Sequence, residues 1–449
     1  MKTVGKIGIL LFLGVLILMT VTGCAIKTSP EELYSLPKLP AQYTELENSI
    51  NEILEGGAEY SAPTSGSNIQ PVQMVDLDGD GKEEAVAFFR KSTDDKPLKI
   101  YIFTAKDNTY QQTAVIEGSG NSIYSIAYSD LDGDGKTELI VGWKVGAELQ
   151  ALSVYSLRSG KPEELMRTPY VKYAVTDLNQ DQKQELVVMH TDGEGGSVAD
   201  YYGWQGQSLT LSSSAKISMT MAELSRVKNG MLEGNVPALF VTGVEDNSAE
   251  ITDILTAPKG ELTNIALSDE TGVSSKIYHF LSLYPTDING DGLTEIPVPV
   301  ILPTRSAPGQ NSYFRIDWCS YDKDGNSKVA ESTYHDTEDG WYLTLPNRWD
   351  GKIMVTREQT GTDEMAVTFS IRGSQDTAPQ DFLRIYTITG DSREYKAVRG
   401  GRFILSRQGE TIFAGELLDG NKGWADGITE DQLRESFNLI TTEWLAGDY

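Results

Sequence analysis

The chain has 449 residues, with 65 acidic and 38 basic side chains and a formal net charge of −27 at pH 7. A surface with this charge repels nucleic acid and anionic lipid headgroups, so we expect neither as a partner. Hydrophobic residues make up 39% of the chain, which is enough for a folded core.

The N-terminus has the features of a bacterial export signal. Two lysines precede an apolar run at residues 7–19, which is too short for an ordinary membrane span and predicts a signal peptide over residues 1–23. The segment Val21–Cys24 resembles a bacterial lipobox, which implies cleavage before Cys24 and a lipid anchor on its sulfur. The alternative is a buried cysteine in a plain signal peptide. With the anchor, the protein is expected at a bacterial cell membrane, facing outside the cytoplasm.

Residues 24–57 are interpreted as a lipidated anchor followed by a helical stalk. Residues 41–55 predict a helix with Leu46 and Ile50 on one side, ended by Gly56 and Gly57. This helix either forms the stalk or packs beside the domain that follows. Acylation of Cys24 leaves no second partner for a disulfide, so Cys319, in the strand-like run 313–321, is expected to be a small buried residue.

Four short segments carry oxygen-bearing side chains at the same positions, counted from the first aspartate of each. The first loop (residues 76–84) has Asp76, Asp78, Asp80, Lys82 and Glu84; the second (130–138) has Asp130, Asp132, Asp134, Lys136 and Glu138; the third (177–185) has Asp177, Asn179, Asp181, Lys183 and Glu185; the fourth (287–295) has Asp287, Asn289, Asp291, Leu293 and Glu295. Calcium binds about six to eight oxygen atoms without strong angular demands. Side chains at positions 1, 3, 5 and 9, with the backbone carbonyl at position 7, therefore predict a Ca²⁺ site in each loop.

Glycine occupies position 6 in three of these loops, where a sharp turn is needed. In the third loop Gln182 replaces it, which is expected to strain the turn or weaken binding. Asp-Gly and Asn-Gly pairs also occur in ordinary hairpin turns, but four copies with the same acids favour calcium. The loops are not EF-hands, because Ala87 and Val141 stand at position 12 and the flanking segments are strand-like.

The spacing of the loops predicts a repeat. The first aspartates are separated by 54, 47 and 110 residues, so a unit of about 50 residues with one member lacking the acids accounts for all four. The degenerate member is expected near residues 228–235, with a strand at 238–245. Each unit contains four strands, with the loop between the first and the second, which is typical of a propeller blade.

The four loops resemble the FG-GAP/VCBS repeats of integrin-α-like β-propellers, over about residues 58–335. The resemblance implies that calcium braces each blade between its first two strands, while recognition takes place elsewhere on the disc. The expected fold is all-β, a β-propeller of four-stranded antiparallel blades over residues 58–420, with short flanking helices. Seven blades are favoured and six are the alternative. Residues 58–63 are expected to close the ring by joining the last blade.

Residues 421–449 are predicted to form a C-terminal amphipathic helix. Thr429 and Gln432 have the spacing of a capping box, and Leu433, Phe437, Ile440 and Trp444 would share one apolar face. The helix is expected to pack on the propeller, with docking of a partner as the alternative.

Motifs for catalysis are missing from the sequence. It contains no GxSxG, HExxH, P-loop lysine or CxxC motif. His190 and His279, at predicted strand ends, and His335, in a predicted polar turn, are expected to be structural or solvated. The aromatic runs 201–204 and 341–342 are interpreted as core, with stacking on sugar rings as the alternative.

The sequence therefore predicts a non-enzymatic, membrane-anchored, calcium-binding β-propeller. It would act as a binding, adhesion or scaffold module for a polysaccharide or protein partner. The alternative is a polysaccharide-acting enzyme, a lyase or glycosidase, whose pair of acids the sequence does not identify.

Overall fold

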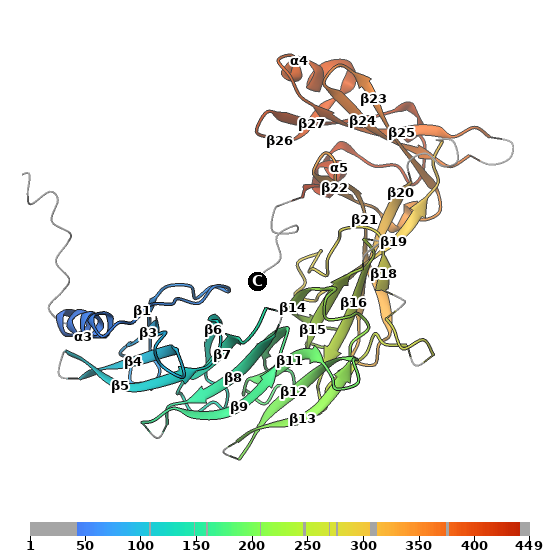
Figure 1. Ribbon diagram of the computed structural model, residues 1–449. Helices are drawn as coiled ribbons and strands as arrows, with labels where there is room; N and C mark the ends of the chain where they lie inside the picture. The colour runs from blue at the N-terminus through green and yellow to red at the C-terminus, as the bar shows by residue number, and fades with distance from the viewer. Residues whose placement is uncertain are drawn as a thin grey trace, which may run out of the picture.

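The computed structural model describes residues 43–440, apart from residues 107–108, 148, 159, 207, 246–247, 269, 275–276, 306–311 and 374–376. The predicted signal peptide, Cys24 and the predicted helical residue Trp444 lie outside the described residues. The described chain is mostly β, with six antiparallel sheets of four or five strands and few helices. The sheets follow one another along an arc, with the first and the sixth sheet at its two ends (Figure 1).

The first sheet contains β1 (Glu59–Tyr60), β2 (Val72–Val75), β3 (Glu84–Arg90), β4 (Leu98–Lys106) and β5 (Thr109–Gly118). The prediction that residues 58–63 join the last blade is wrong, because β1 pairs with β3 of the first sheet. β2 covers only the first half of β3, so the second half needs another partner. β1 supplies it, and Tyr60 stacks on Phe89 with ring centroids 5.0 Å apart.

The second and third sheets have the predicted order of four consecutive antiparallel strands. The second contains β6 (Ser122–Ser129), β7 (Glu138–Lys144), β8 (Gln150–Ser156) and β9 (Glu163–Pro169); the third contains β10 (Lys172–Thr176), β11 (Glu185–Thr191), β12 (Ser197–Gln205) and β13 (Ser208–Lys216). In both sheets the acidic loop joins the first strand to the second, as predicted.

The fourth sheet contains β14 (Leu224–Leu232), β15 (Val236–Val244), β16 (Glu250–Thr256), β17 (Thr263–Asn264) and β18 (Tyr278–His279). This sheet is the predicted degenerate member. A short turn replaces the acidic loop between its first two strands, with Gly234 at φ 78° and Asn235 at φ 57°.

The last two sheets contain the remaining strands. The fifth has β19 (Ile296–Leu302), β20 (Tyr313–Tyr321), β21 (Ser327–Asp336), β22 (Trp341–Thr344) and β28 (Phe437–Leu439); the sixth has β23 (Ile353–Gly361), β24 (Glu364–Ile371), β25 (Gln380–Ile388), β26 (Phe403–Gln408) and β27 (Thr411–Leu417). Because the strand at residue 341 completes the fifth sheet, only one further sheet follows it. The described residues thus form six sheets, the alternative count, and not seven.

Short helices flank and cover the sheets. They are α3 (Thr44–Glu55), α4 (Arg393–Val398), α5 (Glu430–Ser436) and the 3-10 turns η3 (Asn347–Trp349), η4 (Arg399–Gly401) and η5 (Asp419–Asn421). α3 confirms the predicted N-terminal helix, and its buried Leu46 and Ile50 pack against the first sheet. Among the described helices, none has the length and apolar character needed to cross a membrane.

The C-terminal helix is shorter than predicted. The capping box of Thr429 and Gln432 is present, but α5 ends at Ser436. Phe437 begins β28, which pairs with β22 through Leu343, so a helix continuing through Phe437 is wrong. Without β28, the outer edge of β22 would leave backbone groups unpaired, and β28 supplies their partners. Phe437 also stacks on the buried ring of Trp341, with ring centroids 5.5 Å apart.

The hydrophobic core lies between neighbouring sheets. In β3 and β7 every side chain except the last is buried, as expected for strands covered on both faces. Ile102 of β4 and Trp143 of β7 belong to one cluster, which joins the first sheet to the second. Cys319 lies in β20 and is free and buried, as predicted, and burial raises the pKa of its thiol to about 11.

Candidate metal centre

The acidic loops occupy equivalent places in four of the six sheets. In the first three, the glutamate at position 9 is the first residue of β3, β7 or β11. In the fourth loop, Glu295 forms an antiparallel bridge with Thr286 immediately before β19. The rigid second strand therefore fixes the backbone at position 9, while positions 1 to 8 form the turn that leads to it.

The aspartate at position 1 shapes each turn by accepting backbone hydrogen bonds. In the first loop the carboxylate of Asp76 accepts from the amides of Gly79 (2.8 Å) and Gly81 (3.0 Å). The second and fourth loops repeat both bonds at 2.7–2.9 Å. In the third loop Gln182 has φ 70°, a left-handed conformation that is unfavourable for a residue with a Cβ. This confirms the expected strain at position 6.

The glutamate at position 9 is buried in every loop, with at most 3% of its surface exposed. One of its oxygens accepts a hydrogen bond from the amide at position 2, at distances between 2.9 and 3.1 Å. In Glu295 the other oxygen, Oε1, is buried and has no hydrogen-bond partner among the described residues. A buried carboxylate oxygen without a partner is costly, and a cation would satisfy it.

Burial and the neighbouring aspartates act together on these glutamates. Burial, the larger cause, raises the pKa of Glu84 and Glu138, and of Glu185 and Glu295 to about 7. The aspartate carboxylates of each loop raise these pKa values further, since like charges oppose ionisation. Each of the four loops therefore concentrates negative charge, and a divalent cation would relieve it.

Three of the loops bring acid oxygens within 4.8 Å of one another, a spacing that fits one bound ion. The groups are Asp76, Asp78 and Glu84; Asp130, Asp132 and Glu138; and Asp177, Asp181 and Glu185. The fourth loop has Asn289 at position 3 and keeps the same turn. These all-oxygen sets are compatible with Ca²⁺, which prefers carboxylate and carbonyl ligands. Asp80 and Asp134 lie outside the groups, and ligation by the carbonyls at position 7 stays a prediction.

Adjacent loops are joined by backbone hydrogen bonds that the sequence does not reveal. The amide of Thr137, at position 8 of the second loop, donates to the carbonyl of Leu77 in the first (2.9 Å). The amide of Gln184 donates in the same way to Leu131 (3.2 Å). The loops therefore form one continuous edge across the first three sheets.

One cationic side chain at this edge was not found from the sequence. Arg158 follows β8 and forms ion pairs with three acids of the second loop, Asp132, Asp134 and Glu138. No motif marks it, because it comes from the turn between β8 and β9 and meets the acids only in the folded sheet. It also lines a cavity of about 430 Å³, together with Asp78, Glu84 and Lys136 from the first two loops.

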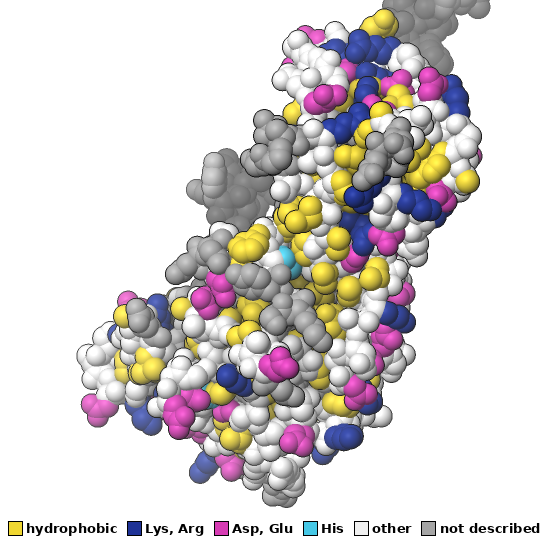
Figure 2. Space-filling model, turned by 90° about the vertical axis from the view of Figure 1, so that its right-hand side faces the viewer, with side chains coloured by type: hydrophobic (Ala, Val, Ile, Leu, Met, Phe, Trp, Pro, Cys, Tyr) yellow, Lys and Arg dark blue, Asp and Glu magenta, His cyan; other side chains and the backbone are white. Residues whose placement is uncertain are grey.

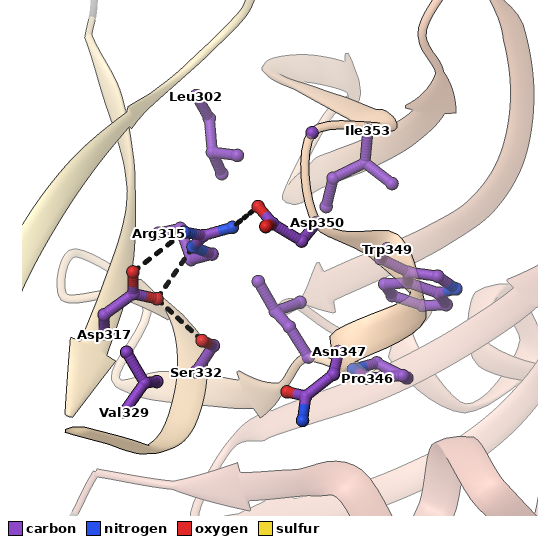
Figure 3. A pocket seen from close by; sticks show the side chains of 12 residues that line it. Leu302, Arg315, Asp317, Val329, Ser332, Pro346, Asn347, Trp349, Asp350 and Ile353 are labelled. Atoms are coloured by element: carbon purple, nitrogen blue, oxygen red, sulfur yellow. Dashed lines mark hydrogen bonds and ion pairs between the residues drawn. The ribbon is translucent and has the colours of Figure 1, made fainter. Parts of the chain in front are cut away.

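A second cavity, of about 220 Å³, lies between the fifth and the sixth sheet (Figure 3). Its polar side is formed by Arg315, which pairs with Asp317 at 2.8 Å and with Asp350. Leu302 and Ile353 face it from the apolar side. The two acids already neutralise the guanidinium. These ion pairs therefore stabilise the junction of the two sheets and do not leave the charge of Arg315 uncompensated for a ligand.

The aromatic runs divide between core and surface. Tyr201 and Trp341 are buried, which confirms the interpretation as core. Trp204 is partly exposed and lies under the guanidinium of Arg158. Hydrophobic side chains also gather at mid-height on the face drawn in Figure 2, and the exposed hydrophobic residues of the molecule include Phe280 and Ile301.

The histidines have structural surroundings. His190 Nε2 lies 2.8 Å from Asp200 Oδ2, and burial lowers the pKa of His279 to about 4. The prediction that His335 lies in a polar turn is wrong, because it belongs to β21 and stacks on Tyr342 at 5.1 Å. The polar residues that follow His335 predicted a turn, although the strand continues to Asp336.

Comparisons with known proteins support the repeat. Residues 76–141, which contain the first and second loops, match the model of the FG-GAP-like repeat. No curated protein matches the chain. Solved structures that align with it include the rhamnogalacturonan lyase YesW (12% identity, 82% of this chain and 92% of that chain, TM-score 0.28). A protein from Lactobacillus plantarum (10%, 67% and 86%, 0.21) and an endo-arabinase from Bacteroides thetaiotaomicron (11%, 72% and 95%, 0.18) also align. At these TM-scores the likeness carries no argument about function.

Proposed function

We propose that this protein is a lipid-anchored, calcium-binding β-propeller that works outside the cytoplasm as a binding or scaffold module for a polysaccharide or protein partner. The observation that carries the calcium part is the buried glutamate at position 9, repeated in four loops with the same backbone hydrogen bond. The lipobox-like segment at Cys24 supports the anchor. The position of the loops at strand junctions favours a bracing role for the metal.

Calcium binding to the folded state alone stabilises it by mass action, by about 2.7 kcal/mol for one site at a hundredfold excess over the dissociation constant. Chelator should therefore lower the melting temperature by several degrees, and Asp130→Ala with Asp132→Ala should reproduce part of that loss. The matched control is Asp322→Ala with Asp324→Ala, in the acidic turn between β20 and β21. A melting curve that is unchanged in excess chelator would contradict the calcium assignment.

The partner is tested with a panel of cell-wall and host glycans, applied once with calcium and once with chelator. Binding that requires calcium would indicate that the calcium-bound sheets recognise the glycan. If none of the glycans binds, the search would turn to protein partners. Release of sugar from a polysaccharide in the same assay would support the enzymatic alternative. The anchor is tested by Cys24→Ser, which should move the protein from the membrane fraction to the soluble fraction.

A further inference from the structure

Arg158 is a cationic side chain that lies directly against the acids of the second loop. Its Nη2 lies 2.6 Å from Asp132 Oδ2 and 3.1 Å from Glu138 Oε1, and its Nε lies 3.0 Å from Asp134 Oδ2. It therefore contacts three of the four acidic side chains predicted to bind calcium there. Two of these acids, Asp132 and Glu138, belong to the group whose oxygens converge on one point.

The guanidinium is held from its other side as well. Its central carbon lies 4.7 Å from the ring centroid of Trp204, which belongs to β12 of the next sheet. The indole nitrogen of Trp204 donates to the carbonyl of Gly206 (3.0 Å), which fixes the ring. Arg158 thus lies between a negatively charged loop and an aromatic face, and both attract a cation.

The first loop differs from the second in this respect, although their sequences are nearly identical. Its own Lys82 pairs with Asp80 at 3.7 Å, and both side chains are exposed. Asp80 is not part of the converging group of that loop. A surface pair of this kind contributes little and does not occupy the centre of the site.

We propose that Arg158 is a built-in competitor of calcium at the second loop, an inference that rests on the proposed calcium-binding function. Without calcium, the guanidinium neutralises Asp132, Asp134 and Glu138. Calcium needs the same carboxylate oxygens, so it binds only when Arg158 withdraws. The adjoining cavity of about 430 Å³, which Arg158 lines, has room for the displaced side chain. The second loop consequently binds calcium more weakly than the first, and its loading changes the surroundings of Trp204.

The test is a calcium titration of the full-length protein by calorimetry, for the parent and for Arg158→Gln. The variant should bind calcium about tenfold or more tightly at one site, because the competing charge-assisted hydrogen bonds are gone. The matched control is Arg167→Gln, on the neighbouring β9, where the arginine pairs with Glu164 at 3.6 Å and is 40% exposed. Its affinities should equal those of the parent. Unchanged or weaker binding by Arg158→Gln would overturn the proposal.

Two further measurements assign the effect to the second loop. Adding Asp132→Asn to Arg158→Gln should abolish the gain in affinity, and a gain that persists would contradict the assignment. Calcium should change the emission of Trp204 in the parent, measured as the difference from Trp204→Phe, and not in Arg158→Gln. If Arg158→Gln does not fold without calcium, Arg158→Lys keeps the charge and should give an intermediate affinity.

The outcomes separate this proposal from the function on which it rests. If no variant binds calcium, both are wrong. If the parent binds calcium and Arg158→Gln binds it identically, only the role of Arg158 is wrong.

Discussion

Glu250 is a buried acid that lies outside the acidic loops. It is the first residue of β16 and is only 2% exposed, and its Oε2 has no hydrogen-bond partner among the described residues. Burial raises the pKa of this carboxyl to about 7, although a hydrogen bond from Ser282 and the charge of Arg226 act in the opposite direction. The folded state therefore favours the protonated form at pH values where the unfolded chain is ionised.

Replacing Glu250 with glutamine should make stability less dependent on pH. Between pH 4.5 and 7 the folded parent binds more protons than the unfolded chain, so its stability falls as pH rises through this window and then levels off. The free energy of unfolding of Glu250→Gln, relative to that of the parent, should therefore rise by up to about 3 kcal/mol as the pH goes from 5 to 8. Urea denaturation at the two pH values measures this. The control is Glu261→Gln, on the surface, and an equal pH dependence in all three proteins would contradict the raised pKa.

The third loop stores strain at Gln182, and relieving it is a second prediction at this scale. The glycines at position 6 of the other loops have φ between 83° and 86°. Gln182 has φ 70°, although its Cβ makes a positive φ unfavourable. Gln182→Gly should stabilise the calcium-free protein by roughly 0.5–1 kcal/mol, after the entropy cost of glycine is subtracted. Chemical denaturation in chelator measures it. Gln184→Gly, two positions later, should be destabilising, and a loss of stability in both variants would contradict the strain.

The residues of the candidate site were predictable only where the chain repeats them at fixed spacing. The aspartates and glutamates of the loops could be found because their positions are local to one turn. Arg158 could not, since it reaches the second loop from the turn between β8 and β9, and Glu250 could not, since its pKa depends on burial by the sheet. The backbone hydrogen bond from Thr137 to Leu77 could not be predicted either, because it joins atoms of two different sheets.

Elements were predictable from local patterns until tertiary contacts decided the outcome. The strands of the second sheet follow their short apolar, β-branched and aromatic runs, and helix α3 follows its hydrophobic periodicity. The segment after Ser436 has a helical pattern too, yet Phe437 enters β28 because the open edge of β22 supplies backbone partners. The edge of β3 draws β1 in the same way.

The short helix α5 is held by packing and not by its own length. Leu433 is fully buried in the cluster between the fifth and sixth sheets, beside Gly415 of β27. Leu433→Ala should destabilise the protein by about 2–5 kcal/mol, because it leaves a cavity in this cluster. Thermal or urea denaturation measures the loss. Glu435→Ala, on the exposed side of the same helix, is the control, and a loss below about 1 kcal/mol for Leu433→Ala would show that α5 is peripheral.

On the scale of the molecule, calcium should stabilise neighbouring loops as a unit. The residue at position 2 serves two loops at once. The amide of Leu77 donates to Glu84 in its own loop, and its carbonyl accepts from Thr137 in the next. An ion that fixes Glu84 therefore also fixes the peptide that holds the second loop. At the fourth sheet the backbone link recurs, since the amide of Thr294 in the fourth loop donates to the carbonyl of Met231 (2.9 Å), but the turn at Gly234 has no acids to bind an ion.

Hydrogen exchange with and without calcium tests this coupling. Calcium should slow exchange in the four loops, because opening them requires loss of the metal, and should leave the turns at residues 233–235 and 361–364 unchanged. Each of these turns joins the first strand of a sheet to the second, in the two sheets that have no acidic loop, so the turns are controls within the same molecule. Asp76→Asn should speed exchange of the amide of Thr137 in calcium, although Thr137 belongs to another loop. If that substitution affects only residues 76–84, the loops bind calcium independently and the shared edge does not couple the sheets.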